Sequence, residues 1–190
     1  MFENEKFDEI LAVLRRGGVI LYPTDTTWGI GCDATNEDAV QQLINIKTEK
    51  PEKGYILLVD SIDMLKKHVS EVHPRVQTLL AYHVRPLTII YEKSVGIAPN
   101  AHAADGSVAV RIVQDAFCRE LIRQFGKPIV KTSANIVGQK FPTHYGEIQS
   151  DILEKVDMVV RLKQDSKVHG ERSIIARFNP EADELDFLRE

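Results

Sequence analysis

The sequence predicts an α/β fold in which helices pack on a twisted sheet of mixed parallel and antiparallel strands. Segments with apolar residues at helical spacing alternate with short apolar runs that are typical of buried strands. Two pairs of these runs lie so close in sequence that their strands should be antiparallel neighbours. The dinucleotide fingerprint GxGxxG and the phosphate-binding pattern GxxxxGK[ST] are both absent. A regular Rossmann arrangement is therefore not expected.

The composition predicts one globular domain over residues 1–190. Hydrophobic residues make up 43% of the chain and charged residues 27%, and this length is sufficient for one well-buried core. The formal net charge of -4 argues against a surface built mainly to bind phosphate backbones. Nucleic acid is therefore not the first partner to expect.

The cysteines and the apolar runs predict a cytoplasmic protein that does not enter a membrane. Cys32 and Cys118 lack CxxC spacing, so neither a disulfide framework nor a cysteine zinc site is indicated. No apolar run approaches the ~18 residues that a membrane span needs. The opening MFENEKFDEI lacks the basic and apolar regions of a signal peptide.

The first helix is predicted from one apolar stripe that ends at Gly17 and Gly18 and leads into a strand over residues 18–23. The stripe consists of Phe7, Ile10, Leu11 and Leu14. A second helix should begin with a capping box formed by Thr35 and Asp38 and end near Lys47.

The later elements follow from the same two periodicities and from glycine, proline and aspartate signals at their ends. Strands are expected over residues 54–60, 85–92, 106–113, 127–135, 156–160, 173–178 and 185–189. Helices are expected over residues 61–68, 70–82, 115–126 and 145–155.

The stretch LYPTDTTWGIG, residues 21–31, ends the first strand in hydroxyls and glycines. Short side-chain oxygens and accessible backbone amides suit the binding of a polar small molecule against a strand end. The alternative interpretation is a capped turn without a ligand.

The stretch KTEKPEK places Lys47, Lys50 and Lys53 at the end of a predicted helix. Lysines at a helix C-terminus interact favourably with the helix dipole, which makes a solvated face the simpler interpretation. The functional interpretation is a cluster that binds a triphosphate.

The strand GSVAVRIV places Arg111 and Ser107 on one face, opposite three apolar residues. An arginine held on a rigid strand can bind a carboxylate with two parallel hydrogen bonds. Because the alternation of one strand does not say which face meets solvent, Arg111 has a surface interpretation and a binding interpretation.

Two further groups of polar residues lie at strand ends. Lys131, Ser133 and Asn135 leave the end of an apolar strand, where serine and asparagine either cap a turn or donate to phosphate. Ser173 begins a strand near the C-terminus, and Arg189 is the penultimate residue, a position that is usually solvated.

Taken together and in this order, these motifs resemble the YrdC/YciO family of threonylcarbamoyl-AMP synthases. The resemblance is carried by PTDTTWGIG, KTEKPEKG, RPLT, SVAVR, TSAN, RSII and the late LR, and it covers about residues 7–189. It implies a single-domain YrdC-like fold with a concave substrate cleft.

The resemblance also implies the reaction and its partners. Such an enzyme joins L-threonine, bicarbonate and ATP, accompanied by Mg²⁺, into threonylcarbamoyl-AMP and releases pyrophosphate. Its product passes to the machinery that transfers threonylcarbamoyl to an adenosine beside the tRNA anticodon. The protein's task is then to position substrates and neutralise charge, so neither a nucleophilic side chain nor a protein metal site is expected.

The resemblance assigns site residues by position. Four match positions that hold threonine: Thr26, Arg111, Lys131 and Ser173. Six match nucleotide positions: Lys47, Lys53, Ser107, Ser133, Asn135 and Arg189.

Three positions depart from the family pattern. The arginine of the basic loop falls on Glu49 in an ungapped alignment, and Lys50 replaces it after a shift of one residue. Arg85 lies where the family has glycine, so it is a candidate for the lost basic residue, and Leu58 replaces a histidine found in some members.

The alternative function is a non-catalytic module that binds structured, double-stranded RNA or a partner protein on the same concave surface. The acidic net charge disfavours it, whereas the altered basic loop favours it. A sugar-phosphate enzyme on a related fold would need paired acids and a metal-binding histidine, and no such cluster is found in the sequence.

Overall fold

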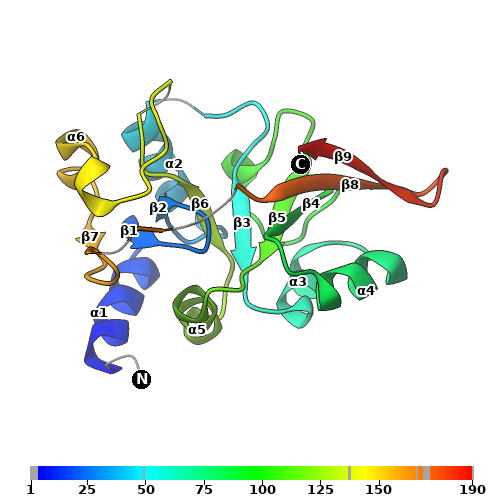
Figure 1. The fold of residues 1–190 in the computed structure, drawn as a ribbon, viewed down its shortest axis with the longest axis horizontal. Coiled ribbons are helices and arrows are strands. Elements are labelled where there is room, and N and C mark those ends of the chain that lie inside the picture. The colour runs from blue at the N-terminus through cyan, green and yellow to red at the C-terminus, as the bar shows by residue number, and fades with distance from the viewer. Residues whose placement is uncertain (1–3, 49, 137, 166, 169–171, 190) are drawn as a thin grey trace.

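One mixed sheet organises the chain (Figure 1). The computed structural model describes residues 4–48, 50–136, 138–165, 167–168 and 172–189, with side chains from residue 7 onward. The described strands follow the order β7-β1-β2-β6-β3-β5-β4-β8-β9 across the sheet. Parallel pairing joins β1 to β7, β3 to β5 and β4 to β8, while the other neighbours are antiparallel. The mixed α/β class predicted from the sequence is confirmed.

The strands and helices lie close to the predicted segments. The strands are β1 (Ile20–Pro23), β2 (Trp28–Gly31), β3 (Ile56–Val59), β4 (Leu87–Tyr91), β5 (Val108–Ile112), β6 (Ile129–Ser133), β7 (Met158–Val159), β8 (Ile174–Asn179) and β9 (Glu184–Arg189). The α-helices are α1 (Asn4–Arg15), α2 (Glu37–Lys47), α3 (Ile62–His68), α4 (Pro74–Tyr82), α5 (Ala116–Phe125) and α6 (Ser150–Leu153). Short 3₁₀ turns occupy Pro99–Ala101 and Tyr145–Glu147.

Strand β2 is not among the strands expected from the sequence. It pairs antiparallel with β1 through a tight connection and with β6 on its other side. A Cβ on Gly31 would lie 2.2 Å from the carbonyl oxygen of Val130, so β6 approaches too closely for any other residue. The glycines that concealed the strand in the sequence are therefore what allows it to pack.

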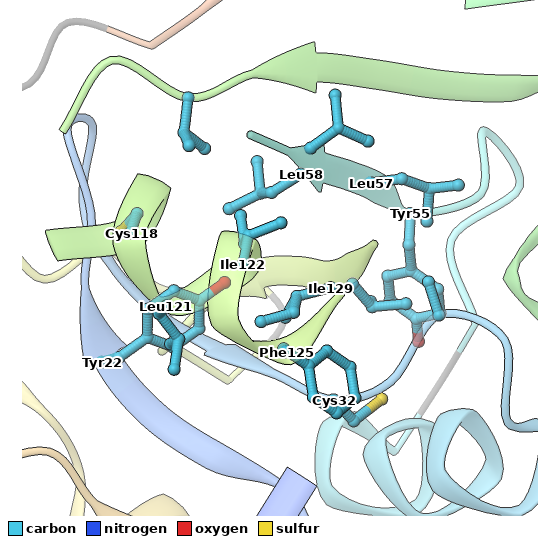
Figure 2. Packing of buried hydrophobic residues seen from close by; sticks show 14 of the residues in the cluster. Tyr22, Cys32, Tyr55, Leu57, Leu58, Cys118, Leu121, Ile122, Phe125 and Ile129 are labelled. Atoms are coloured by element: carbon cyan, nitrogen blue, oxygen red, sulfur yellow. The ribbon is translucent and has the colours of Figure 1, made fainter. Parts of the chain in front are cut away.

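Helix α5 contributes five buried residues to the core. Asp115 caps it by accepting from the amide of Cys118 at 3.0 Å, and Gly126 ends it with φ 78°. Its apolar face packs on the sheet, and α1 packs beside it through Phe7 and Phe117, whose ring centres are 5.4 Å apart. Figure 2 shows apolar side chains of α5 beside those of β1, β3 and β6: Leu121, Ile122 and Phe125 with Tyr22, Leu58 and Ile129.

Three predicted helix boundaries are wrong for local reasons. Helix α2 is capped by Asn36, which accepts from the Ala39 amide at 3.1 Å, while Thr35 donates its hydroxyl to Asp33 instead. Helix α4 begins only at Pro74, because Val69 pairs with Ser94 in an isolated bridge before it. The helix expected over residues 145–155 is divided into a 3₁₀ turn and the short α6. In the described part of the chain, no helix is long and apolar enough to cross a membrane.

Candidate active site

The connection between β1 and β2 is built around one threonine hydroxyl. The Oγ1 of Thr24 donates to the carbonyl of Thr27 at 2.8 Å and accepts from the amides of Thr26 and Thr27 at 3.2 and 3.3 Å. The residues between β1 and β2 therefore form a capped turn. The turn also fixes Thr26 and Thr27 at the edge of a pocket, where both side chains are buried.

A pocket of about 190 Å³ opens where this turn meets the centre of the sheet. Thirteen of its lining residues come from the turn, from β3, β5, β6 and β9, and from the segments that precede β3 and β8: Thr26, Thr27, Pro51, Gly54, Tyr55, Ile56, Arg111, Lys131, Thr132, Ser133, Arg172, Ser173 and Arg189. Phe141 completes the lining, with the guanidinium of Arg172 4.7 Å from its ring centre. We call this space the smaller pocket.

All four residues assigned to threonine line the smaller pocket: Thr26, Arg111, Lys131 and Ser173. The Oγ1 of Thr26 accepts from Lys131 Nζ at 3.3 Å and from an Arg111 Nη at 3.4 Å. The structure thus brings together residues that are far apart in the sequence, and it places two basic side chains around one hydroxyl.

Arg111 is not the surface arginine that one interpretation of its strand allowed. It is 1% exposed, because β5 is buried on both faces, and one Nη donates to Asp25 Oδ1 at 2.8 Å. Within the described residues, Arg111 Nε and Asp25 Oδ2 have no protein hydrogen-bond partner. Asp25 is not among the site residues expected from the sequence, although the acid in PTDT was a visible signal for a partner to a buried cation.

Arg189 is held in place and is not a loose terminal residue. Its Nε and one Nη donate to the carbonyl of Ser173 at 3.0 and 2.6 Å, and the same Nη donates to Ser173 Oγ at 3.1 Å. Thr88 donates to that hydroxyl from β4 at 2.9 Å. Burial, and then the nearby Arg172 and Arg111, lower the pKa of Arg189 from its usual value. The far end of the sheet therefore adds a fixed cation to the smaller pocket.

A second pocket of about 370 Å³ adjoins the first. The two share Pro51, Tyr55, Thr132, Ser133 and Phe141. The second pocket also reaches Lys47, Asn135, Gly138 and Gln139. We call it the larger pocket; the shared wall gives the site two adjoining compartments of different size.

The turn after β6 shapes the larger pocket through Lys47, which is 7% exposed. Its Nζ donates to the Ser133 carbonyl at 3.0 Å, to Asn135 Oδ1 at 3.3 Å and to the Asn135 carbonyl. Ser133 Oγ donates to Asn135 Oδ1 at 2.5 Å, and Asn135 Nδ2 donates to the Gln139 carbonyl at 2.7 Å. Lys47 is therefore part of the turn, as well as part of the pocket wall.

The remaining assigned positions line neither of these two pockets. Lys53 is exposed and lines neither of them, and Ser107 is buried with its hydroxyl donating to Asp105 at 2.6 Å. Arg85 is exposed and lines neither pocket, while Leu58 lies in the core. Glu49, on which the family's basic residue falls, is outside the residues that the structure describes.

Two glycine substitutions should distinguish an effect on the packing of the sheet from an effect on the pocket. In Gly31→Ala the new Cβ meets backbone of β6, which cannot move cheaply, so we expect a loss of stability of at least about 1–3 kcal/mol. In Gly29→Ala the new Cβ lies 2.9 Å from Lys131 Cε, the flexible end of a side chain, and 3.0 Å from the carbonyl of Thr132. Expressed as free energies, we expect the loss of threonine binding in Gly29→Ala to exceed the loss of stability. In Gly31→Ala we expect the loss of stability to exceed the loss of threonine binding.

Urea denaturation and isothermal calorimetry with threonine measure both quantities. Equal loss of stability in the two variants would show that Gly29 is required by the sheet and not by the position of Lys131.

The chain is similar in sequence and in fold to proteins of one known family. The Sua5/YciO/YrdC family model, described as "Telomere recombination", matches residues 12–190. The chain is 31% identical over 160 residues to a threonylcarbamoyl-AMP synthase of Vibrio parahaemolyticus, covering 83% of this chain and 86% of the relative. It is 33% identical over 181 residues to a threonylcarbamoyl-AMP synthase of Xanthomonas euvesicatoria, covering 91% and 97%.

Solved structures share the fold at lower identity. Sua5 of P. abyssi complexed with L-threonine aligns with a TM-score of 0.83 at 24% identity, over 93% of this chain and 52% of that one. E. coli YciO aligns with a TM-score of 0.83 at 19% identity, over 99% and 90%. The chain thus spans about half the length of the P. abyssi protein. The fold, the extent of the family match and the identity to these relatives lead to one conclusion: this chain belongs to the Sua5/YciO/YrdC family.

Proposed function

We propose that this chain is a nucleotidyltransferase that makes threonylcarbamoyl-AMP from L-threonine, bicarbonate and ATP and releases pyrophosphate. The observation that carries the proposal is the pair of adjoining pockets, one small and rich in cations and hydroxyls, the other larger and bounded by the turn after β6. The relatives that match most of this chain are named for this product. The combination of an amino-acid-sized site and a neighbouring nucleotide-sized site fits the joining of two such substrates.

In this proposal the smaller pocket holds threonine. Arg111, whose Nε has no protein partner among the described atoms, provides positive charge for the threonine carboxylate. Arg189, which the resemblance assigns to the nucleotide, lines this pocket and not the larger one, so we propose that its charge also acts here. The hydroxyls of Thr26 and Ser173 give short polar contacts at the same wall. Arg189 is half-buried and the others are buried, and all are already hydrogen-bonded, so little ordering is needed when threonine binds.

The larger pocket then receives ATP, with its α-phosphate at the shared wall formed by Thr132 and Ser133. The threonine amine attacks carbon dioxide derived from bicarbonate, and a carbamate oxygen attacks the α-phosphorus. The bond to the β-phosphate breaks, and pyrophosphate leaves with the electron pair. No side chain needs to form a covalent bond, so the protein contributes position and electrostatic stabilisation.

Magnesium enters this scheme as part of the MgATP substrate. Among the described residues there is no group of three or more His, Cys, Asp or Glu side chains that could hold a metal ion. The wall of the larger pocket offers amide, hydroxyl and ammonium groups, which suit phosphate oxygens better than a divalent cation. Phosphate oxygens and water are then the expected ligands of the ion.

We further propose that the chain acts as one domain in the cytoplasm. The continuous sheet supports residues 1–190 acting as one domain. The product would pass to the machinery that transfers threonylcarbamoyl to tRNA, and the expected compartment is the cytoplasm. The two free, buried cysteines are compatible with that compartment.

The test is pyrophosphate release by the purified chain with threonine, bicarbonate and MgATP, and with each omitted in turn. We expect release only when all three are present. If no pyrophosphate forms at millimolar ATP while the chain retains structured RNA in a low-salt gel shift, the synthase proposal fails and the RNA-binding alternative replaces it.

Ser133 offers a milder test of the larger pocket. Ser133→Ala removes one hydroxyl that donates to Asn135 and lines both pockets, so we expect a stability loss of about 1 kcal/mol. We expect the ATP KM to rise at least tenfold, with the threonine KM little changed. Equal changes in both Michaelis constants would indicate a general distortion of the turn and would contradict a nucleotide contact.

A further inference from the structure

Lys131 is a buried amine that contacts no carboxylate among the residues the structure describes. Strand β6 places it at the wall of the smaller pocket with 8% exposure. Its Nζ donates to the hydroxyls of Thr27 and Thr26, at 2.9 and 3.3 Å. Both partners are neutral, which is unusual for a lysine so deeply buried.

The charged and titratable groups that act on Lys131 lie on β5, on β9, on α5 and in the turn between β1 and β2. Arg111 lies on β5, with one Nη sharing the Thr26 hydroxyl, and Arg189 adds a second cation from β9. Asp25, in the turn between β1 and β2, and Cys118, on α5, act in the opposite direction. Asp25 is already paired with Arg111 at 2.8 Å. Burial and then Arg111 lower the pKa of Lys131 to about 7.

A neutral lysine amine has two N–H groups and one lone pair. The two threonine hydroxyls can accept both N–H groups, which leaves the lone pair for a third partner. Because Lys131 lines the smaller pocket, that partner can be a group of the bound substrate.

Free threonine arrives with a protonated amine, and an ammonium has no electron pair with which to attack carbon dioxide. Resting on the proposed function, we propose that Lys131 accepts the proton of the threonine ammonium and thereby produces the attacking amine. The proton moves from the threonine nitrogen to Lys131 Nζ, and the freed pair forms the N–C bond. Bicarbonate dissociates into carbon dioxide and hydroxide. The hydroxide removes the second proton from the threonine nitrogen once the N–C bond has formed, and so becomes water. Lys131 returns its proton to solvent when the product leaves.

The competing role for Lys131 is that of a permanent cation that binds the threonine carboxylate. The two roles predict opposite effects of pH on threonine affinity. In the proposed complex, Lys131 and the threonine nitrogen share one removable proton. Protonated Lys131 and free threonine ammonium each carry such a proton, so their binding must release one to solvent. Affinity then rises about tenfold per pH unit below the pKa of Lys131 and levels off above it. If Lys131 binds the carboxylate, affinity falls as pH rises through the same range.

The experiment measures the threonine dissociation constant by calorimetry between about pH 6 and pH 8 for the wild type, for Lys131→Met and for Lys67→Met. Lys67 is an exposed residue of α3 outside both pockets and serves as the matched control. We expect the affinity of the wild type and of Lys67→Met to rise to a plateau near pH 7. Lys131→Met should bind threonine with little dependence on pH. Its pyrophosphate release should fall at least 100-fold and recover in part with added small primary amines.

The wild-type titration decides the question even if Lys131→Met fails to fold. A wild-type affinity that is constant or falls with rising pH, in a protein that still releases pyrophosphate, overturns the role of Lys131 and leaves the synthase activity intact. A wild type that neither binds threonine nor releases pyrophosphate overturns the proposed function itself.

Discussion

Replacing Arg111 with methionine is expected to abolish detectable threonine binding and to lower the free energy of unfolding by about 3–5 kcal/mol. The loss is large because the substitution leaves Asp25 without its cation, and that carboxylate is only 12% exposed. The transition midpoint in urea and the calorimetric titration of threonine measure the two effects separately.

The matched control removes both charges. In the double variant Arg111→Met with Asp25→Asn, no uncompensated charge is buried, so most of the lost stability should return. Threonine binding should not return, because the guanidinium that meets its carboxylate is still absent. Wild-type threonine affinity in either variant would show that Arg111 serves only the fold.

Substitution of Lys47 and of Lys53, which lie in the same short segment, should have contrasting effects on stability and on the ATP KM. Lys47→Met removes a buried ammonium that donates to oxygens of Ser133 and Asn135, so we expect a stability loss of about 2–3 kcal/mol. The ATP KM should rise at least tenfold, because the turn that bounds the larger pocket loses its support. Lys53→Met changes an exposed side chain, so its stability should change by less than about 0.5 kcal/mol.

The salt dependence of the ATP KM distinguishes the two variants further. If Lys53 acts on ATP only through long-range attraction, the effect of Lys53→Met should diminish as ionic strength rises. The effect of Lys47→Met should persist at high salt, because it comes from the shape of the turn. A Lys47→Met protein of unchanged stability would contradict the role of Lys47 in holding that turn.

Most of the fold could be predicted because local signals agree with the tertiary structure. Helix α5 has a capping aspartate, an apolar face and a terminal glycine, and the structure retains all three. Strand β2 could not be predicted, because glycine is unfavourable in strands in general and is required here only by the approach of β6. That approach is a tertiary contact between distant segments, which the local sequence does not indicate.

The site was predictable in part for a similar reason. The order of the motifs selected Thr26, Arg111, Lys131 and Ser173, and all four line one pocket. The partners of those residues depend on how distant segments meet, so the pairing of Arg111 with Asp25 was not foreseen.

The same limit applies to Lys47, whose sequence context suggested a lysine at a solvated helix end or at a phosphate. In the structure its ammonium lies in the turn after β6, since α2 ends beside that turn.

The most direct test of the central claim is the identity of the product formed from ¹³C-labelled bicarbonate, L-threonine and MgATP. Carbon NMR and mass spectrometry of the quenched reaction should show one labelled carbon bonded between the threonine nitrogen and the phosphate oxygen of AMP, in equal amount to the pyrophosphate released. Arg111→Met with Asp25→Asn should give neither product. If pyrophosphate is absent, or forms without threonine and without label in an AMP ester, the chain does not catalyse the proposed synthesis.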